Sequence, residues 1–237
     1  MKSTYLWVDF LTVIIPFIFS FHPKLNFYKN FKPFFAANAL VAIFFIGWDI
    51  HFTQIGVWGF NSDYVTGLHF INLPIEEILF FICIPFACVF TYHCLNLFFK
   101  IRWSLKTKRL IVLGLSGTLF FTGMFFHTKL YTSYTFISLS VLLLAIHFVA
   151  KVKWLPTLFM VYLVLLLPFL IVNGILTGTG LEQPIVWYNN DENLGIRLMT
   201  IPVEDVFYGF ELILLNVFFY EYFKGKFHNQ LAKQIPD

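Results

Sequence analysis

Two pairs of adjacent carboxylic acids are the residues of this chain with the clearest capacity for chemistry. Glu76 and Glu77 follow a Leu-Pro-Ile triplet, and Glu204 and Asp205 follow an Ile-Pro-Val triplet. Carboxyl groups act as general acids and bases, so the two pairs could give a proton to a substrate and remove another. The chain around them is apolar, because 59% of its 237 residues are hydrophobic and only 12% are charged. Acids in such surroundings are costly and usually functional.

Each acidic pair is expected in the first turn of a helix. Asn72 and Thr200 are of types that cap helices, and the prolines that follow them suit a first turn, where a missing N–H costs no hydrogen bond. Neighbouring helical residues point about 100° apart. One member of each pair should therefore face a cavity while the other holds the outer loop. The helix dipole favours the charged carboxylate and burial favours the neutral acid, so charged, neutral and mixed states stay open.

Other residues could assist the acids. Glu204, Tyr208 and Glu211 share one helical face at spacings of four and seven residues. The expected supporting residues are Glu211, Asp49, Asn173 and Tyr208. Nearby aromatic rings could stabilise a cation through their π faces. The expected substrate-binding residues are Trp48, Trp58, Phe60, Asn61, Phe80, Phe81, Trp187 and Phe207.

The alternative is a purely structural role, in which the acids are helix caps at the membrane interface and are exposed to outer water. Their duplication disfavours this interpretation. For Asp9, Asn38 and Glu221, which are not duplicated, a structural role is favoured.

An internal repeat places the two acidic pairs in equivalent positions. Residues 57–81 resemble the stretch around residues 186–210, and within it the acids align at an offset of 128 residues. Upstream, residues 48–53 align with residues 172–177 at an offset of 124. Four aligned residues are expected to shape the turn before each acidic pair: Gly67, Gly195, Pro74 and Pro202.

The elements that carry these residues must be membrane helices. A bilayer crossing needs about 20 mostly apolar residues, and its backbone groups must be satisfied within the segment. Seven stretches meet this need approximately: Tyr5–Phe21, Phe34–Ile50, Leu73–Phe99, Leu110–Phe126, Leu130–Ala150, Trp154–Ile175 and Ile201–Phe223. The predicted fold is an all-α integral membrane protein of about seven transmembrane helices.

The predicted helices form two parallel three-helix repeats joined by an extra helix. The first repeat covers residues 1–100, the linking helix residues 101–129, and the second repeat residues 130–237. Because four crossings separate the third helix from the seventh, both acidic pairs begin on the same side of the membrane. In repeat-built membrane proteins the working site commonly lies between the repeats.

The basic residues predict the orientation. Of the 16 Lys and Arg residues, only Lys2, Lys129 and Arg197 fall on the side of the acidic pairs. By the positive-inside rule, the N-terminus is outside the cell membrane and the C-terminus is cytoplasmic. The basic side can meet anionic lipid. Because these basic residues form the rim of a membrane protein, we do not expect the chain to bind nucleic acid.

The sequence lacks the motifs that are typical of several other classes of protein. Cys83, Cys88 and Cys94 match no metal or redox spacing, the histidines form no metal-binding pattern, and no glycine-rich dinucleotide loop is found. The seventh predicted helix holds no lysine for a retinal Schiff base. We therefore expect no metal site.

Four short motifs carry a family resemblance: NLPIEE and TIPVED, with WDIHFT and VNGILTG ahead of them. They resemble the lycopene cyclase domain family, the small membrane type of lycopene β-cyclase. This type consists of two subunits in some bacteria, is fused in archaea and other bacteria, and is joined to phytoene synthase in fungi. The resemblance covers both halves and implies the fused two-repeat form, with Asp205 in place of a Glu.

The resemblance implies a role in carotenoid biosynthesis, in which an acid protonates an acyclic ψ end group, a ring closes, and a base removes a proton to leave a β-ionone ring. Lycopene would become γ- and β-carotene with Glu76, Glu77, Glu204 and Asp205 as the acid and base set. This isomerisation needs no cofactor by stoichiometry. The implied partners are lycopene or a related acyclic carotenoid, the lipid bilayer and other carotenoid-pathway enzymes.

Two other functions stay open at this point. A non-catalytic carotenoid-binding scaffold would return its ligand unchanged. A small proton-linked carrier would need polar residues along a path to the cytoplasmic side. The sequence leaves open the ring type, the number of ends cyclised, the acid that donates the proton and the oligomeric state.

Overall fold

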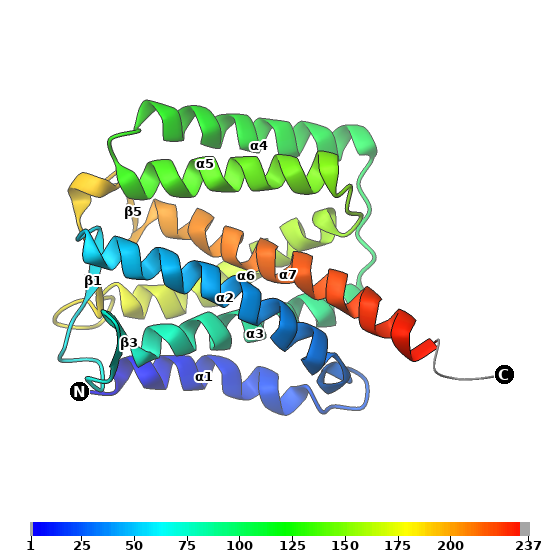
Figure 1. Ribbon diagram of the computed structural model, residues 1–237, viewed down its shortest axis with the longest axis horizontal. Coiled ribbons are helices and arrows are strands. Elements are labelled where there is room, and N and C mark those ends of the chain that lie inside the picture. Colours follow the sequence, from blue (N-terminus) through cyan, green and yellow to red (C-terminus); the bar gives the residue numbers. More distant parts are fainter. Residues whose placement is uncertain (1, 233–237) are drawn as a thin grey trace.

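The computed structural model describes residues 2–232 as a bundle of seven α-helices (Figure 1). The helices are α1 (Thr4–Phe19), α2 (Phe31–Gln54), α3 (Ile75–Phe98), α4 (Leu105–Phe125), α5 (Leu130–Leu144), α6 (Leu155–Leu176) and α7 (Val203–Ala232). A 3-10 turn, η1 (Phe27–Asn30), precedes α2, and a π-helical turn, η2 (Ala145–Val149), extends α5. The prediction of an all-α membrane protein is confirmed. Lys233 and the end of the second predicted repeat lie outside the described residues.

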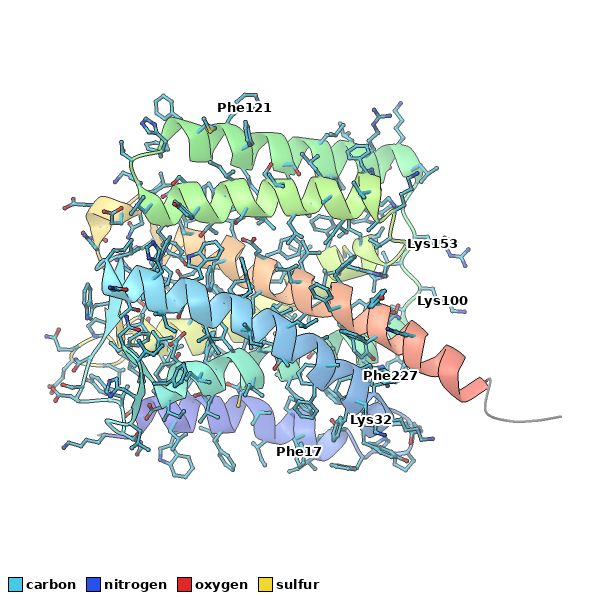
Figure 2. All side chains as sticks on the ribbon, viewed as in Figure 1. Phe17, Lys32, Lys100, Phe121, Lys153 and Phe227 are labelled. Carbon is cyan, nitrogen blue, oxygen red and sulfur yellow. The ribbon has the colours of Figure 1, made fainter. Side chains whose placement is uncertain are left out.

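Six of the described helices are long and apolar enough to cross a membrane, and α1 is shorter. At 1.5 Å per residue, the 16 residues of α1 span about 24 Å, less than the roughly 30 Å of the hydrocarbon core. Aromatic side chains such as Phe17 and Phe121 cover the outside of the bundle (Figure 2). This surface suits contact with lipid chains.

The bundle has two chemically different ends. All the short strands lie at the end where the chain begins, and we call it the hairpin end (Figure 1). Lys32, Lys100 and Lys153 lie at the opposite end, which we call the basic end (Figure 2). The alternation of helix direction along the chain puts α1, α3, α5 and α7 with their N-termini at the hairpin end.

A small hairpin introduces each acidic helix. Strands β2 (His69–Phe70) and β3 (Leu73–Pro74) pair before α3, and β5 (Arg197–Leu198) and β6 (Ile201–Pro202) pair before α7. Both hairpins turn through a residue with positive φ, 59° at Ile71 and 58° at Met199. Such a conformation is uncommon for a residue other than glycine, so its recurrence shows that the repeats share a fold.

The expected helix caps are wrong. Pro74 is the residue before α3, and no side chain caps that helix. Asn72 instead donates a 2.8 Å hydrogen bond to the Ile50 carbonyl, and Thr200 lies 3.3 Å from the equivalent carbonyl of Gly174. Both side chains therefore tie the hairpin to the end of the preceding long helix. The hairpin occupies the residues that the cap prediction assigned to the first turn.

One pair of strands joins the two repeats. Strand β1 (Trp58–Phe60) runs antiparallel to β4 (Val186–Tyr188), with Gly59 opposite Trp187. These segments are equivalent in the repeat, so an approximate two-fold axis passes through the pair. A Cβ at Gly59 would lie 2.4 Å from the Trp187 ring, so only glycine fits beneath it. The pair forms a roof over the hairpin end of the bundle.

The helices below the roof depart from two-fold symmetry. Helix α2 packs closely on α7, whereas its counterpart α6 makes fewer contacts with α3. Phe81 of the first repeat is fully buried against α2, and the equivalent position of the second repeat is Gly209. Gly209 lines a cavity between α6 and α7, where the Tyr162 hydroxyl and the Phe169 ring of α6 approach it. One repeat is thus filled where the other is open.

Candidate active site

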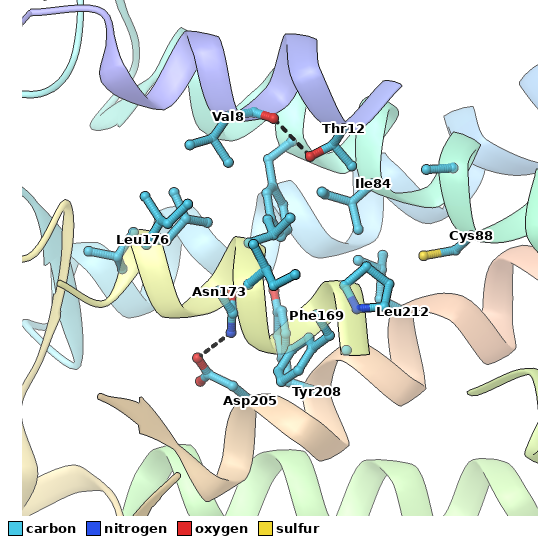
Figure 3. A pocket seen from close by; sticks show the side chains of 18 of the residues that line it. Val8, Thr12, Ile84, Cys88, Phe169, Asn173, Leu176, Asp205, Tyr208 and Leu212 are labelled. Atoms are coloured by element: carbon cyan, nitrogen blue, oxygen red, sulfur yellow. Dashed lines mark hydrogen bonds between the residues drawn. The ribbon is translucent and has the colours of Figure 1, made fainter. Parts of the chain in front are cut away.

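A cavity of about 540 Å³ occupies the open half of the bundle. Its walls come from α1, α3, α6 and α7, and Trp58, Phe60, Val186 and Tyr188 of the strand pair close it at the hairpin end. Figure 3 shows Asp205 and Cys88 toward its two ends. Most of its lining is apolar, and the acids collect below the roof. Cavities of this size commonly bind small molecules.

The first repeat contributes two carboxyl groups to the cavity. Glu77 accepts a 2.5 Å hydrogen bond from the Tyr5 hydroxyl, and Asp49 accepts one of 2.9 Å from Tyr208. The Asp49 and Glu77 side chains also lie in hydrogen-bonding contact with each other. Two carboxyl groups can share such a bond only when one of them holds a proton. A proton shared between the two carboxyl groups would satisfy this contact.

The second repeat contributes one carboxyl group, held by neutral donors. Asp205 accepts hydrogen bonds from the Tyr131 hydroxyl at 2.6 Å, the Asn173 amide at 2.8 Å and the Tyr188 hydroxyl at 3.0 Å. Burial, reinforced by the Asp205 charge, raises the pKa of Tyr188 in the roof well above its usual value. The phenol is thus a neutral donor. Three donors to one carboxyl suit the ionised form.

The repeat gives these two clusters a common plan with one chemical difference. Glu77 aligns with Asp205 at the offset of 128 residues, and Asp49 aligns with Asn173 at the offset of 124. Each site therefore joins an acid at the start of its helix to a polar side chain from the preceding long helix. In the first repeat that partner is an acid, and in the second it is an amide. An amide donates without needing a titratable proton.

The other member of each acidic pair holds a loop. One oxygen of Glu76 accepts a 2.7 Å hydrogen bond from the Thr66 backbone N–H, and Glu204 does the same for Leu194. The Thr132 hydroxyl donates a further hydrogen bond of 2.6 Å to Glu204. Glu76 and Glu204 are buried but do not line the cavity. The two residues of each pair thus divide into one that faces the cavity and one that supports the hairpin.

The electrostatics of the cavity favour a positive guest. Asp49, Glu77 and Asp205 line it, and no Lys or Arg is among its lining residues. Aromatic rings surround the acids, with Tyr131 and Tyr188 stacked at 5.8 Å and Trp58 edge-on to Tyr131 at 5.0 Å. Their faces attract cations. A carbocation would find negative charge and π faces but no competing positive side chain.

The comparison with known families matches the sequence of the chain in two separate stretches. A family model described as lycopene cyclase matches residues 2–95 and again residues 128–223, which are the two repeats. The chain belongs to the lycopene cyclase family. No curated protein and no solved structure matches it. Membership places this multi-pass membrane protein in carotenoid biosynthesis, among proteins that cyclise carotenoids.

The structure divides the other residues expected at the candidate site into two groups. Asp49, Asn173 and Tyr208 line the cavity together with Trp58, Phe60 and Phe80. The remaining expected residues, Trp48, Asn61, Phe81, Trp187, Phe207 and Glu211, do not line it. Glu211 faces α5, where it accepts a 2.8 Å hydrogen bond from Ser138, and Phe207 packs on Phe136 of the same helix. Glu211 lies seven residues, or about two helical turns, after Glu204. Both therefore lie on the face of α7 that is turned away from the cavity.

Three tyrosines that donate hydrogen bonds to the acids were not expected from the sequence: Tyr5, Tyr131 and Tyr188. The repeat held a signal for one of them. Tyr188 aligns with Phe60, so the second repeat adds a hydroxyl where the first has none. Tyr5 and Tyr131 each lie near the start of the first helix of a repeat. Position alone did not separate them from interfacial aromatics.

Two further acids, Asp9 and Glu221, lie outside the cavity. Among residues 2–232, no group of three or more His, Cys, Asp or Glu is placed to hold a metal ion. Asp9 is buried on α1, and neither of its carboxyl oxygens has a hydrogen-bond partner in the described chain. Glu221 accepts a 3.0 Å hydrogen bond from Tyr92 near the basic end. Neither acid lines the cavity.

Proposed function

We propose that this protein is a lycopene β-cyclase that converts acyclic ψ end groups into β-ionone rings. The observation that carries the proposal is the meeting of a proton-sharing acid pair and a separate carboxylate in one apolar cavity. Cyclisation of an acyclic end needs one group that gives a proton and one that takes a proton. The two repeats supply one of each.

The reaction conserves atoms and electrons. Protonation of C2 in the terminal C1=C2 double bond leaves a cation at C1. The C5=C6 bond attacks it, which joins C6 to C1 and moves the positive charge to C5. Loss of the C6 proton then forms the C5=C6 bond of the β ring. One proton enters and one leaves, so the product is an isomer of the substrate.

We assign the proton donor to Asp49 and Glu77. Because this pair shares a proton, its loss to the substrate leaves two carboxylates close together, held by hydroxyls of Tyr5 and Tyr208. Those carboxylates then face the new cation. The negative charge on these carboxylates therefore develops close to the positive charge on the substrate. Because the carboxylates are held in place, this arrangement stabilises the transition state.

We assign the base to Asp205. Its carboxylate is held by Asn173, Tyr131 and Tyr188, which fix its position without giving it an exchangeable carboxylic proton. After deprotonation of C6, the proton must return to the donor pair or leave through the polar side chains below the roof. Glu76 and Glu204 support the hairpins that place Glu77 and Asp205.

The roof and the membrane protect the intermediate. Strands β1 and β4 close the hairpin end with aromatic side chains, and exclusion of water prevents capture of the cation as an alcohol. We further propose that the hairpin end faces outside and the basic end faces the cytoplasm, in agreement with the distribution of Lys and Arg. Other carotenoid-pathway enzymes would then meet the substrate in the same bilayer.

The inner part of the cavity argues against a proton-linked carrier. Beyond the acids, the lining toward the basic end includes Cys88, Tyr162, Leu165 and Ile213, and it holds no chain of Asp, Glu, His, Lys or Arg. A carrier needs such a chain to reach the other side. A carotenoid-binding scaffold fits the same cavity, and only turnover separates it from an enzyme.

Pigment analysis of cells that accumulate lycopene tests the proposal. Expression of the chain should convert lycopene into γ- and β-carotene, whereas Glu77→Gln at the same protein level should leave lycopene unchanged. Lycopene that stays acyclic with correctly inserted protein would refute cyclisation. Formation of ε or γ rings alone would refute the assigned loss of the C6 proton.

A further inference from the structure

The cavity has an opening, and its place can be read from the lining residues. Nearly all of them are buried or half-buried, but Leu11 and Ile15 on α1 and Pro168 and Ile171 on α6 are exposed. These residues lie part-way along the two helices, away from the roof. The cavity therefore communicates with the outside of the bundle between α1 and α6.

The packing of the two helices agrees with this opening. Helix α1 packs closely on α3 but makes few contacts with α6. Each of the facing helices carries a proline that lines the cavity, Pro16 on α1 and Pro168 on α6. Proline removes one backbone hydrogen bond from the helix interior. The two helices that border the gap thus each lack one interior backbone hydrogen bond.

The surroundings of the gap suit lipid chains. Leu11 is 62% exposed and Ile171 is 60% exposed, and both lie within apolar helices. At the hairpin end the cavity is lined by side chains of β1 and β4, none of which is exposed to the extent of the residues that border the gap. A ligand that reaches the acids must be one that dissolves in the bilayer.

We propose that the gap between α1 and α6 is a lateral entrance through which one end of an acyclic polyene leaves the bilayer and reaches the acids. The rest of the polyene stays among the lipid chains. This entrance rests on the proposed function for its ligand, because only an apolar chain with a reactive end uses both the gap and the acids. Each entry then presents one end group to Glu77 and Asp205.

Bulky substitutions test the entrance at two exposed residues that border the gap, Leu11 and Ile171, which we call its lips. The variants are Ile171→Trp and Leu11→Trp, and the matched controls are Leu167→Trp and Ile18→Trp. The control residues are 70% and 59% exposed on the same two helices but do not line the cavity. In proteoliposomes loaded with lycopene, the lip variants should lose about tenfold in kcat/KM, whereas the controls should stay near the parent rate. Equal rates in lip and control variants would overturn the entrance.

A binding readout separates the entrance from catalysis. Benzoylphenylalanine replaces Ile171 in one protein and Leu167 in another, and illumination in lycopene-containing vesicles captures a neighbouring polyene. A coloured adduct at position 171 well above that at position 167 supports the entrance even if no ring forms, in which case the proposed function fails alone. Equal labelling at both positions means that lycopene meets the whole lipid face alike, and the entrance is rejected whether or not the protein cyclises.

Discussion

The side-chain amide of Asn173 donates a 2.8 Å hydrogen bond to Asp205. This bond stands where the first repeat brings Asp49 into contact with Glu77. Duplication made the two sites alike, and a single change from acid to amide makes them differ in what they can do with a proton. An acid next to an acid stores a proton, whereas an amide next to an acid stabilises a carboxylate.

Asp49→Asn should abolish storage of the proton, because both repeats would then pair an acid with an amide. We expect the rate of ring formation to fall by about 10²-fold or more, the usual contribution of a general acid. The measurement is the initial rate of lycopene conversion in membranes with equal amounts of protein. Asp63→Asn, which neutralises an exposed loop acid, is the matched control and should leave the rate unchanged.

The double variant Asp49→Asn/Asn173→Asp extends this test. It moves the acid–acid pair to the second repeat while keeping the total charge. We expect measurable ring formation to return relative to Asp49→Asn alone, since one cavity receives both sites. A single variant as active as the parent protein would remove Asp49 from the mechanism.

Glu76→Gln and Glu204→Gln should have small effects, since a glutamine oxygen can still accept the backbone N–H of Thr66 or Leu194. We expect rates within about tenfold of the parent, against a loss of about 10²–10⁴-fold for Glu77→Gln. Glu76→Ala should instead lower thermal stability, because a buried N–H without its partner costs about 1–3 kcal/mol. Loss of turnover in both glutamine variants with unchanged stability would return Glu76 and Glu204 to the catalytic set.

Tyr188→Phe removes one of three hydrogen bonds to Asp205. A hydrogen bond to a charged group contributes about 1.5–3 kcal/mol, so we expect the rate to fall about tenfold or somewhat more. Tyr134→Phe, at an exposed position of α5, is the control and should change nothing. A rate equal to that of the parent would show that this bond does not assist turnover.

The raised pKa of Tyr188 adds a pH test. A phenol donates below its pKa and loses its proton above it, and the ordinary value for tyrosine is about 10. Because burial raises the pKa, Tyr188 stays a donor throughout neutral and moderately alkaline solution. The pH profiles of the parent and Tyr188→Phe should therefore run parallel up to about pH 10. Convergence of the two profiles below that pH would contradict the assignment.

Gly209→Phe should close the cavity, because it places in the second repeat the ring that fills the first at Phe81. A Cβ at Gly209 would already lie 3.3 Å from the Tyr162 hydroxyl and 3.5 Å from the Phe169 ring. We expect loss of both lycopene binding and ring formation. Gly47→Phe is the matched control, since its Cβ meets nothing within 4 Å. Retained turnover in Gly209→Phe would show that the reaction occurs elsewhere.

The repeat carried most of what could be predicted about the fold. The alignment of Gly67 with Gly195, both at positive φ, located the turn before each acidic helix, and apolar length located the helices. The hairpins escaped prediction because strands of two residues leave no periodic pattern. The predicted caps at Asn72 and Thr200 were wrong for the same reason.

The candidate site was predictable in its acids but not in its pairings. Helical geometry indicated that one acid of each pair faces inward, but the choice between Glu76 and Glu77 depends on where α2 delivers Asp49. The closed half carries Phe81 at the position where the open half carries Gly209. The effect of this difference depends on how α2 and α6 pack against the acidic helices. The sequence of one segment alone does not predict that packing.

The cross-repeat strand pair has a consequence for how such a protein can be divided. If the chain were cut between its repeats, each half would present the edge of a strand with unpaired backbone groups, an edge that attracts a complementary strand. Reunion of β1 with β4 would complete the roof at the same moment as it joined the halves. Assembly and closure of the reaction chamber would thus be one event, and neither half alone could shelter a carbocation.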